Sequence, residues 1–227
     1  LDLTEPITET EIDLDLGDVM AAHKQSGALA TLVVRPDPAA QTWGAIDAPA
    51  DGGAIRSILG TGDYMFTGVH VIAPELIARL ADQDEPQCIV KQGYLPWLAQ
   101  GDALNAYVTR GYFMEHSTPE RYWQGTQNLL SRLVELAHPP GTLTGVHPRA
   151  RVAASARLVE PLRVGPDAVI GAGARIGPGT VVGARAIVLP RVELEGAFVW
   201  PDVLVTESAT RTIVTAKARY LLPTAPS

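Results

Sequence analysis

The sequence predicts an α/β domain followed by a parallel β-helix, and two observations support this fold class. Residues 1–138 alternate apolar segments of strand length with amphipathic segments of helix length. From Val146 onward the chain follows a six-residue period. Residues 139–145 are rich in proline and glycine, so we expect domains at 1–138 and 146–222 joined by this linker.

Capping and turn residues indicate where the helices and strands of the first domain begin and end. A helix over 16–26 is expected because Asp13 or Asp15 can cap its start and Gly27 can end it. Two further helices begin at prolines, near Pro74 and Pro119, the second running towards Ala137. The other expected elements are strands at 28–34, 64–72, 104–109 and 112–116, a hairpin joining 42–46 to 54–59, and a helix at 88–99.

The six-residue period is unbroken over ten units. The residue that opens each unit is apolar, namely Val146, Val152, Leu158, Val164, Ile170, Ile176, Val182, Val188, Leu194 and Trp200. In a parallel β-helix each unit is one short strand and a turn, and its opening residue points to the axis. We expect about three coils over 146–205 with all ten openers buried. Residues 206–222 or another subunit should cover the end that carries Phe198 and Trp200.

Composition excludes several classes of protein. A net charge of −7 with a pI near 5.2 argues against a nucleic-acid partner, and no apolar run is long enough for a membrane span. A single cysteine, Cys88, excludes an internal disulfide framework and a multi-cysteine zinc site. The chain opens without a basic or apolar leader, so we expect a cytoplasmic protein.

No complete catalytic motif is visible in the residues alone. The first domain has no glycine-rich phosphate loop before a helix and no His-x-x-x-His pair. The repeat contains one histidine, His147, next to Pro148. A hexapeptide acyltransferase would need a histidine base, and we interpret His147 as a turn residue instead.

The order of five segments resembles a known family. The segments are Asp13–Leu16 with its helix, Ala28–Val34, Met65–Val71, Cys88–Gln92 and Gly111–Tyr122. In this order, and followed by hexads, they resemble sugar-1-phosphate nucleotidyltransferases, in particular the bacterial mannose-1-phosphate guanylyltransferase-like proteins with a hexapeptide-repeat tail. The resemblance implies an N-terminally truncated nucleotidyltransferase: an incomplete Rossmann-like mixed sheet, followed by a left-handed parallel β-helix.

The resemblance also implies a reaction and partners. Members of this family transfer a nucleoside monophosphate from an NTP to a sugar 1-phosphate and release pyrophosphate, with Mg²⁺ as cofactor. Their triphosphate-binding loop and its lysine have no counterpart in residues 1–227. We therefore expect no complete catalytic set, an inactive chain on its own, and a homo-oligomer formed through the β-helix.

Three site residues are carried over from the family pattern. Glu115 occupies the position of a metal-binding aspartate, and Thr67 and Gly68 fall in the sugar-contact segment. Phe66 stands where many relatives have asparagine, and Glu9 stands where they have the first metal-binding aspartate. Without the resemblance, Glu115 reads as a strand-end carboxylate near a helix N-terminus, and Gly68 as a glycine within a packed strand.

Two other functions stay open. A non-catalytic regulatory or assembly subunit is favoured by the residues at positions 9, 66 and 115, and a hexapeptide acyltransferase is disfavoured by the scarcity of histidine in the repeat. Neither the sugar nor the nucleotide can be read from the residues present.

Overall fold

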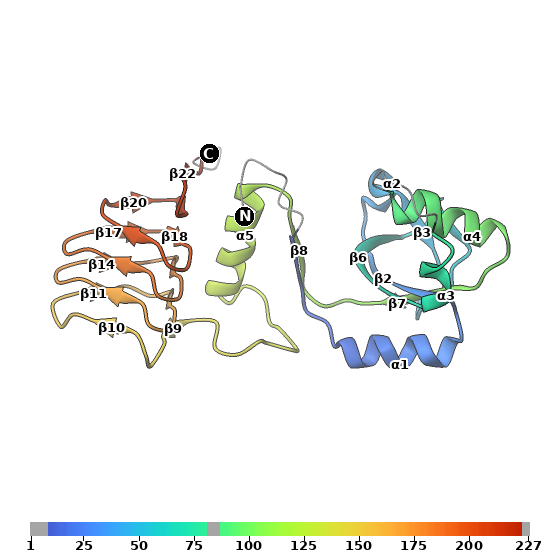
Figure 1. Cartoon of the computed structure of the whole chain (residues 1–227), viewed down its shortest axis with the longest axis horizontal. Helices are drawn as coiled ribbons and strands as arrows, with labels where there is room; N and C mark the ends of the chain where they lie inside the picture. The colour runs from blue at the N-terminus through green and yellow to red at the C-terminus, as the bar shows by residue number, and fades with distance from the viewer. Residues whose placement is uncertain (1–8, 81–86, 224–227) are drawn as a thin grey trace. The chain divides into compact units, whose positions relative to one another are not determined.

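The computed structural model describes residues 9–80 and 87–223, which divide into two compact units (Figure 1). The sheet unit comprises Leu14–Gly111. The β-helix unit comprises the described residues up to Asp13 together with those from Tyr112 onward. The expected linker at 139–145 lies inside the β-helix unit.

The sheet unit contains one mixed sheet, with strand order β4-β7-β2-β6-β3-β5. Only β2 and β7 run parallel, and the other neighbours are antiparallel. The central strands bury apolar side chains on both faces, which explains the uninterrupted apolar run of β2. The strands are β2 (Ala30–Pro36), β3 (Ala45–Asp47), β4 (Gly53–Ala54), β5 (Ser57–Gly60), β6 (Tyr64–Ile72) and β7 (Leu104–Val108).

Helix α1 (Leu16–Ser26) begins and ends as expected. The Asp15 carboxylate accepts hydrogen bonds from the backbone N–H groups of Gly17, at 2.6 Å, and Asp18, at 3.3 Å. Gly27 follows the helix with φ near +61°, a conformation that suits glycine. The expected strand over 64–72 coincides with β6. The expected hairpin of 42–46 with 54–59 is shorter, since β3 pairs with β5, whereas Ala40–Trp43 form a helical turn and β4 pairs with β7.

The remaining helices of the sheet unit are short. They are α2 (Ala40–Trp43), α3 (Pro74–Ile77), the π-helix η1 (Ile89–Tyr94) and α4 (Leu95–Ala99). The single helix expected at 88–99 is therefore a π-helical turn that continues into an α-helical one. Its apolar side chains, Tyr94 and Trp97, are buried against the sheet.

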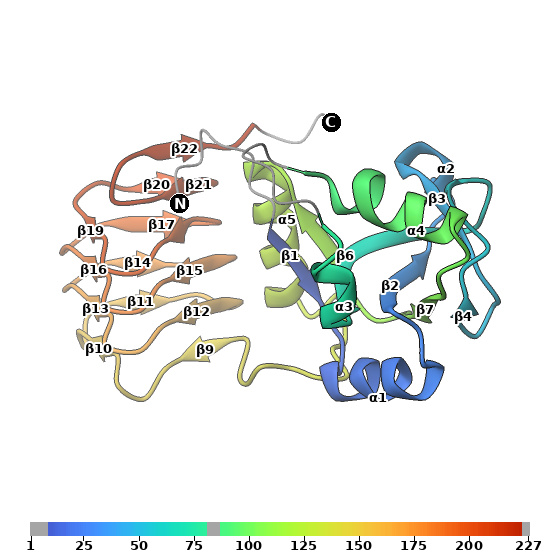
Figure 2. The same ribbon diagram turned by 45° about the vertical axis from the view of Figure 1, so that its right-hand side comes forward.

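The C-terminal part of the chain is a parallel β-helix, with strands stacked in three faces (Figure 2). Among the described residues two faces have four strands each, and the third has five parallel strands plus the antiparallel β22. This makes about four turns. The strands are β9 (Gly145–Val146), β10 (Arg151–Val152), β11 (Arg157–Leu158), β12 (Leu162–Val164), β13 (Val169–Ile170), β14 (Arg175–Ile176), β15 (Thr180–Val182), β16 (Ile187–Val188), β17 (Glu193–Glu195), β18 (Phe198–Val199), β19 (Leu204–Val205), β20 (Ala209–Thr210), β21 (Thr212–Val214) and β22 (Arg219–Leu221).

The expectation that all ten openers are buried is wrong for four of them. Those from Val164 to Leu194 are buried in one continuous core. Val146 and Leu158 are 41% and 36% exposed and Val152 is half-buried, because they belong to the first coil and only one side of it is covered by another described coil. Trp200 is half-buried because the unit opened by Leu194 has five residues, so Val199 pairs with Val182 and takes the inward position.

The other end of the β-helix is covered by the chain itself, one of the two expected arrangements. β22 pairs antiparallel with β21. Phe198 is buried in a cluster with Ile213 and Leu222. Residues 206–222 thus supply the cover.

Helix α5 (Pro119–Leu130) packs beside the face formed by β18 and β21. Its Trp123 indole N–H donates to the Gly196 carbonyl at 2.8 Å, and Leu130 joins the Phe198 cluster. α5 does not run towards Ala137 as expected. Arg132 has φ near +55°, which ends the helix, and the backbone N–H of Ala137 donates to the Asp13 carboxylate instead of continuing the helix. A two-stranded antiparallel sheet, β1 (Glu9–Ile12) with β8 (Phe113–His116), completes this unit.

Candidate functional site

Thr67 and Gly68 lie in a bulge of β6, inside the sheet unit. The register between β2 and β6 shifts at this point, so that Thr67, Gly68 and Val69 lie opposite the single residue Val33. The Thr67 hydroxyl is buried and donates to the Val33 carbonyl at 2.9 Å. In this structure Thr67 therefore holds the bulge together.

Gly68 is the exposed part of that bulge. Its φ is near +85°, which disfavours any residue with a Cβ, and beyond its two chain neighbours nothing lies within 4 Å of the position where a Cβ would stand. A ligand could approach the backbone here without meeting a side chain. The bulge supplies an open backbone position on a rigid strand.

Phe66 and His70 flank the bulge within an aromatic cluster. Their rings stack with centroids 5.7 Å apart, and Nδ1 of His70 lies 2.9 Å from the Tyr94 hydroxyl oxygen. Burial lowers the pKa of His70 and raises the pKa of Tyr94. Both groups are thus uncharged near neutral pH, and one hydrogen bond joins the Tyr94 hydroxyl to Nδ1 of His70.

Phe66 also borders a small apolar pocket of about 140 Å³. Trp43 and Leu59, which line it too, are both exposed, and Leu59 has an unusual φ near +59° for a bulky residue. Every side chain around this pocket is apolar. Phe66 therefore presents an apolar ring to this pocket.

Glu115 lies in the other unit, at the end of β8. Its half-exposed carboxylate has Nη2 of Arg121 3.8 Å away, and its backbone carbonyl accepts from Nε of Arg121 at 2.8 Å. Thr10 is its cross-strand neighbour. Arg121 is in the first turn of α5. Glu115 therefore lies near the end of its strand and close to the N-terminus of this helix, as its sequence context indicates.

A magnesium site at Glu115 stays a prediction. Mg²⁺ prefers several oxygen ligands in octahedral geometry. In the described part of the chain no three His, Cys, Asp or Glu side chains gather as metal ligands would, and an arginine stands beside Glu115. Glu9 lies opposite His116 in β1, but its side chain is outside the described residues. Mg²⁺ commonly takes one or two protein carboxylates and fills its other positions with water and phosphate oxygens, so Glu115 as a single protein ligand stays a prediction.

Sequence reasoning missed a buried pair beneath α5. The imidazole of His116 is buried, and its Nε2 lies 3.5 Å from Oε2 of Glu11 on the neighbouring strand. Neither atom has a hydrogen-bond partner among the described residues. A Cβ at Gly125 would lie 2.5 Å from that Nε2, so glycine at this point of α5 makes room for the pair. A glycine within a helical pattern was the available signal.

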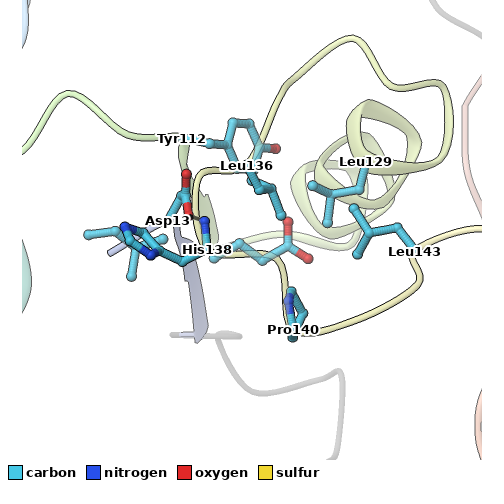
Figure 3. Close-up of a pocket in the computed structure, with 9 residues that line it drawn as sticks. Asp13, Tyr112, Leu129, Leu136, His138, Pro140 and Leu143 are labelled. Carbon is cyan, nitrogen blue, oxygen red and sulfur yellow. Dashed lines mark hydrogen bonds between the residues drawn. The ribbon is translucent and has the colours of Figure 1, made fainter. Parts of the chain in front are cut away.

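The same unit contains a pocket of about 310 Å³ (Figure 3). Asp13 and His138 lie on one side of it and Leu129 and Leu143 on the opposite side, with Leu136 between them. Both oxygens of the buried Asp13 carboxylate accept backbone N–H groups, from Ala137 at 2.6 Å and from His138 at 2.8 Å. The pocket is lined by Glu11, Ile12, Asp13, Tyr112, Leu129, Leu136, His138, Pro140 and Leu143.

His147 has a local role in the first turn of the β-helix. Its Nδ1 accepts the backbone N–H of Arg149 at 3.2 Å. This agrees with its interpretation as a turn residue. No helix within residues 9–80 or 87–223 has the length and apolar composition that crossing a membrane requires.

Comparison with known proteins adds little beyond the fold. No protein-family model matches the chain, and no curated protein sequence matches it. Among solved structures, a UDP-glucose pyrophosphorylase from Acinetobacter baumanii is similar, with a TM-score of 0.43 and 17% identity. The match covers 54% of this chain and 48% of that one, so the chain spans about half the length of that structure. Similarity at this level carries no functional argument.

Proposed function

We propose that this chain is part of a sugar-1-phosphate nucleotidyltransferase, most like a mannose-1-phosphate guanylyltransferase. In such an enzyme the sugar phosphate oxygen attacks the α-phosphorus of an NTP in line, and pyrophosphate leaves. The chain would contribute the sugar side of the site, at Thr67 and Gly68, and Glu115 as a ligand for Mg²⁺. The triphosphate would be held by residues outside residues 1–227.

One observation carries the proposal. The five family-like segments occur in order, and the segment expected to contact sugar contains an exposed bulge with open space where a Cβ of Gly68 would stand. A sugar ring needs close approach to backbone donors and acceptors, and an open glycine in a fixed bulge permits it. Thr67 contributes by fixing the bulge through its bond to Val33.

A second candidate is a non-catalytic regulatory or assembly subunit. The proximity of Arg121 to Glu115 favours it, because a guanidinium group competes with a metal ion for the same carboxylate. Under this proposal the chain performs no transfer.

The activity test compares two forms of the protein. A chain extended upstream by its natural coding sequence should release pyrophosphate from an NTP and a sugar 1-phosphate, whereas residues 1–227 alone should not, because nothing neutralises the triphosphate. Turnover by residues 1–227 alone would contradict the assignment of the nucleotide half to another segment. An extended chain that is inactive with every NTP, yet alters a partner's activity, would establish the regulatory candidate.

The sugar-contact test uses a matched pair of glycines. Gly68 and Gly101 both have left-handed backbone, with φ near +85° and +90°, and both stand in open space. Gly68→Ala and Gly101→Ala therefore carry similar backbone strain. Only Gly68→Ala should weaken binding of a sugar 1-phosphate, by about tenfold or more, since its methyl group obstructs the ligand. Calorimetric titration of the extended chain measures this, and equal losses in both variants would remove Gly68 from the site.

The metal test compares two carboxylates near the start of α5. Glu115→Gln should raise the Mg²⁺ concentration needed for half-maximal turnover of the extended chain, whereas Glu120→Gln, an exposed residue of the first helical turn, should not. An unchanged Mg²⁺ requirement in Glu115→Gln leaves the strand-end interpretation of this residue.

A further inference from the structure

The 310 Å³ pocket of the β-helix unit combines apolar walls with the carboxylate of Glu11. No lysine or arginine among the described residues pairs with this carboxylate, and its neighbour is His116. We propose that the pocket binds a small organic cation, a primary ammonium group on a compact apolar body. The apolar body would lie against Leu129, Leu136 and Leu143, and the ammonium group would pair with Glu11. This binding does not depend on the proposed transfer reaction.

The charges around the pocket select a cation. Of its two carboxylates, Asp13 is saturated by the amides of Ala137 and His138. Oε2 of Glu11 is buried beside His116 and accepts no hydrogen bond from the described residues, whereas the side chain as a whole is 30% exposed, so the other oxygen of the carboxylate is the one that a ligand in the pocket would meet. No lysine or arginine is among the described residues that line the pocket. A carboxylate on an apolar wall is costly to desolvate unless it is paired, and an ammonium ligand supplies that pair.

Two groups near Glu11, the imidazole of His116 and the hydroxyl of Tyr112, affect the charge of the pocket. Nε2 of His116 lies 3.5 Å from Oε2 of Glu11, behind the pocket wall and not among the residues that line it. Tyr112 lines the pocket, and its hydroxyl accepts from the Asn128 amide at 3.2 Å. Burial, opposed by that bond and reinforced by the charge of Glu11, raises the pKa of Tyr112, so it stays neutral. Tyr112 therefore adds no charge to the pocket.

Size sets the class of the apolar body. A volume of about 310 Å³ is at the small end of ligand pockets, which suits a single ring or a short branched chain. The five apolar residues of the lining, with Pro140 and Ile12 beside the three leucines, exclude water from the ring. Benzylammonium has this size and this charge and is the probe we choose.

The experiment is calorimetric titration of the 227-residue chain at low salt with three ligands of one shape. Benzylammonium is expected to bind at least about tenfold more tightly than neutral benzyl alcohol, and benzoate the most weakly, because one charge-assisted hydrogen bond distinguishes them. Equal affinity for all three, or absence of binding by benzylammonium, overturns the proposal. This series needs no variant and so does not depend on how a substitution folds.

Two variants locate the recognition group. Glu11→Gln keeps the shape of the side chain and should abolish the preference for benzylammonium over benzyl alcohol. Glu120→Gln removes the same charge from an exposed position of α5, outside the pocket, and should preserve that preference. Circular dichroism verifies that both variants fold. A folded Glu11→Gln protein that retains the tenfold preference refutes the role of Glu11.

Discussion

At the scale of single residues, Gly125 shows how one missing side chain determines a local arrangement. It is buried in the middle of α5, directly over the His116–Glu11 pair. A Cβ there would be 2.5 Å from Nε2 of His116 and 3.1 Å from both Oε2 of Glu11 and Cγ of Met114. Alanine is otherwise preferred over glycine in a helix by about 1 kcal/mol, so helix propensity and packing oppose each other at this position.

At Gly125 we expect the cost of overpacking to exceed the gain in helix propensity. Gly125→Ala should lower the free energy of unfolding by about 1 kcal/mol or more, since overpacking a fixed site costs about 1–3 kcal/mol. Gln124→Ala, the exposed neighbour in the same helix, should change it by less than about 0.5 kcal/mol. Urea unfolding followed by circular dichroism measures both. A stabilised Gly125→Ala protein would mean that His116 and Glu11 move apart at little cost.

The sequence predicted some residues of the candidate sites and not others. Gly68 was placed in a strand by its sequence pattern and in the sugar-contact segment by resemblance, whereas the bulge around it was not predicted, because it depends on the register between β2 and β6. The His116–Glu11 pair could not be predicted, because it exists only where β1 pairs with β8, more than a hundred residues further along the chain. The functions assigned to Thr67, Gly68 and Glu115 remain predictions.

At the scale of elements, the six-residue period of the repeat predicted more of the secondary structure than the propensities of single residues did. The hexads predicted the β-helix because six residues form one strand and one turn of every coil. They could not reveal the five-residue unit that begins at Leu194, since Phe198, Val199 and Trp200 are all apolar and any of them fits an inward position. Only the pairing of Val199 with Val182 identifies the inward residue. Similarly, α5 ended early because Asp13 binds the backbone at 137 and 138, a contact that helix periodicity does not contain.

The inward position of Val199 has a measurable consequence. Val199→Thr places a hydroxyl among the apolar side chains of the β-helix core, at a cost of about 1–3 kcal/mol in the free energy of unfolding. Ile187→Thr, at an outward position that is 42% exposed, should cost less than about 1 kcal/mol. Thermal and urea unfolding followed by far-ultraviolet circular dichroism compare the two. An Ile187→Thr loss equal to that of Val199→Thr would contradict the register.

At the scale of the whole molecule, the two ends of the β-helix differ. One end is covered by β22 and Leu222. At the other, β9, β10 and β11 each have a strand partner on one side only among the described residues, and Val146 and Leu158 are exposed. Unpaired strand edges beside apolar side chains favour association.

We therefore propose that the chain is a homo-oligomer and that the first coil of the β-helix forms the contact. Light scattering of the chromatographed 227-residue protein should give a mass of two or more chains. Leu158→Glu should reduce it to one chain, because a carboxylate at this edge cannot be buried without a partner. Leu204→Glu is the control, since Leu204 is 57% exposed on β19, far along the stack from the first coil. If Leu204→Glu dissociates the oligomer and Leu158→Glu does not, the contact lies nearer the covered end. If the unaltered chain has the mass of a monomer at high concentration, the proposal of an oligomer is wrong, and the first coil is stable with its strand edges in water.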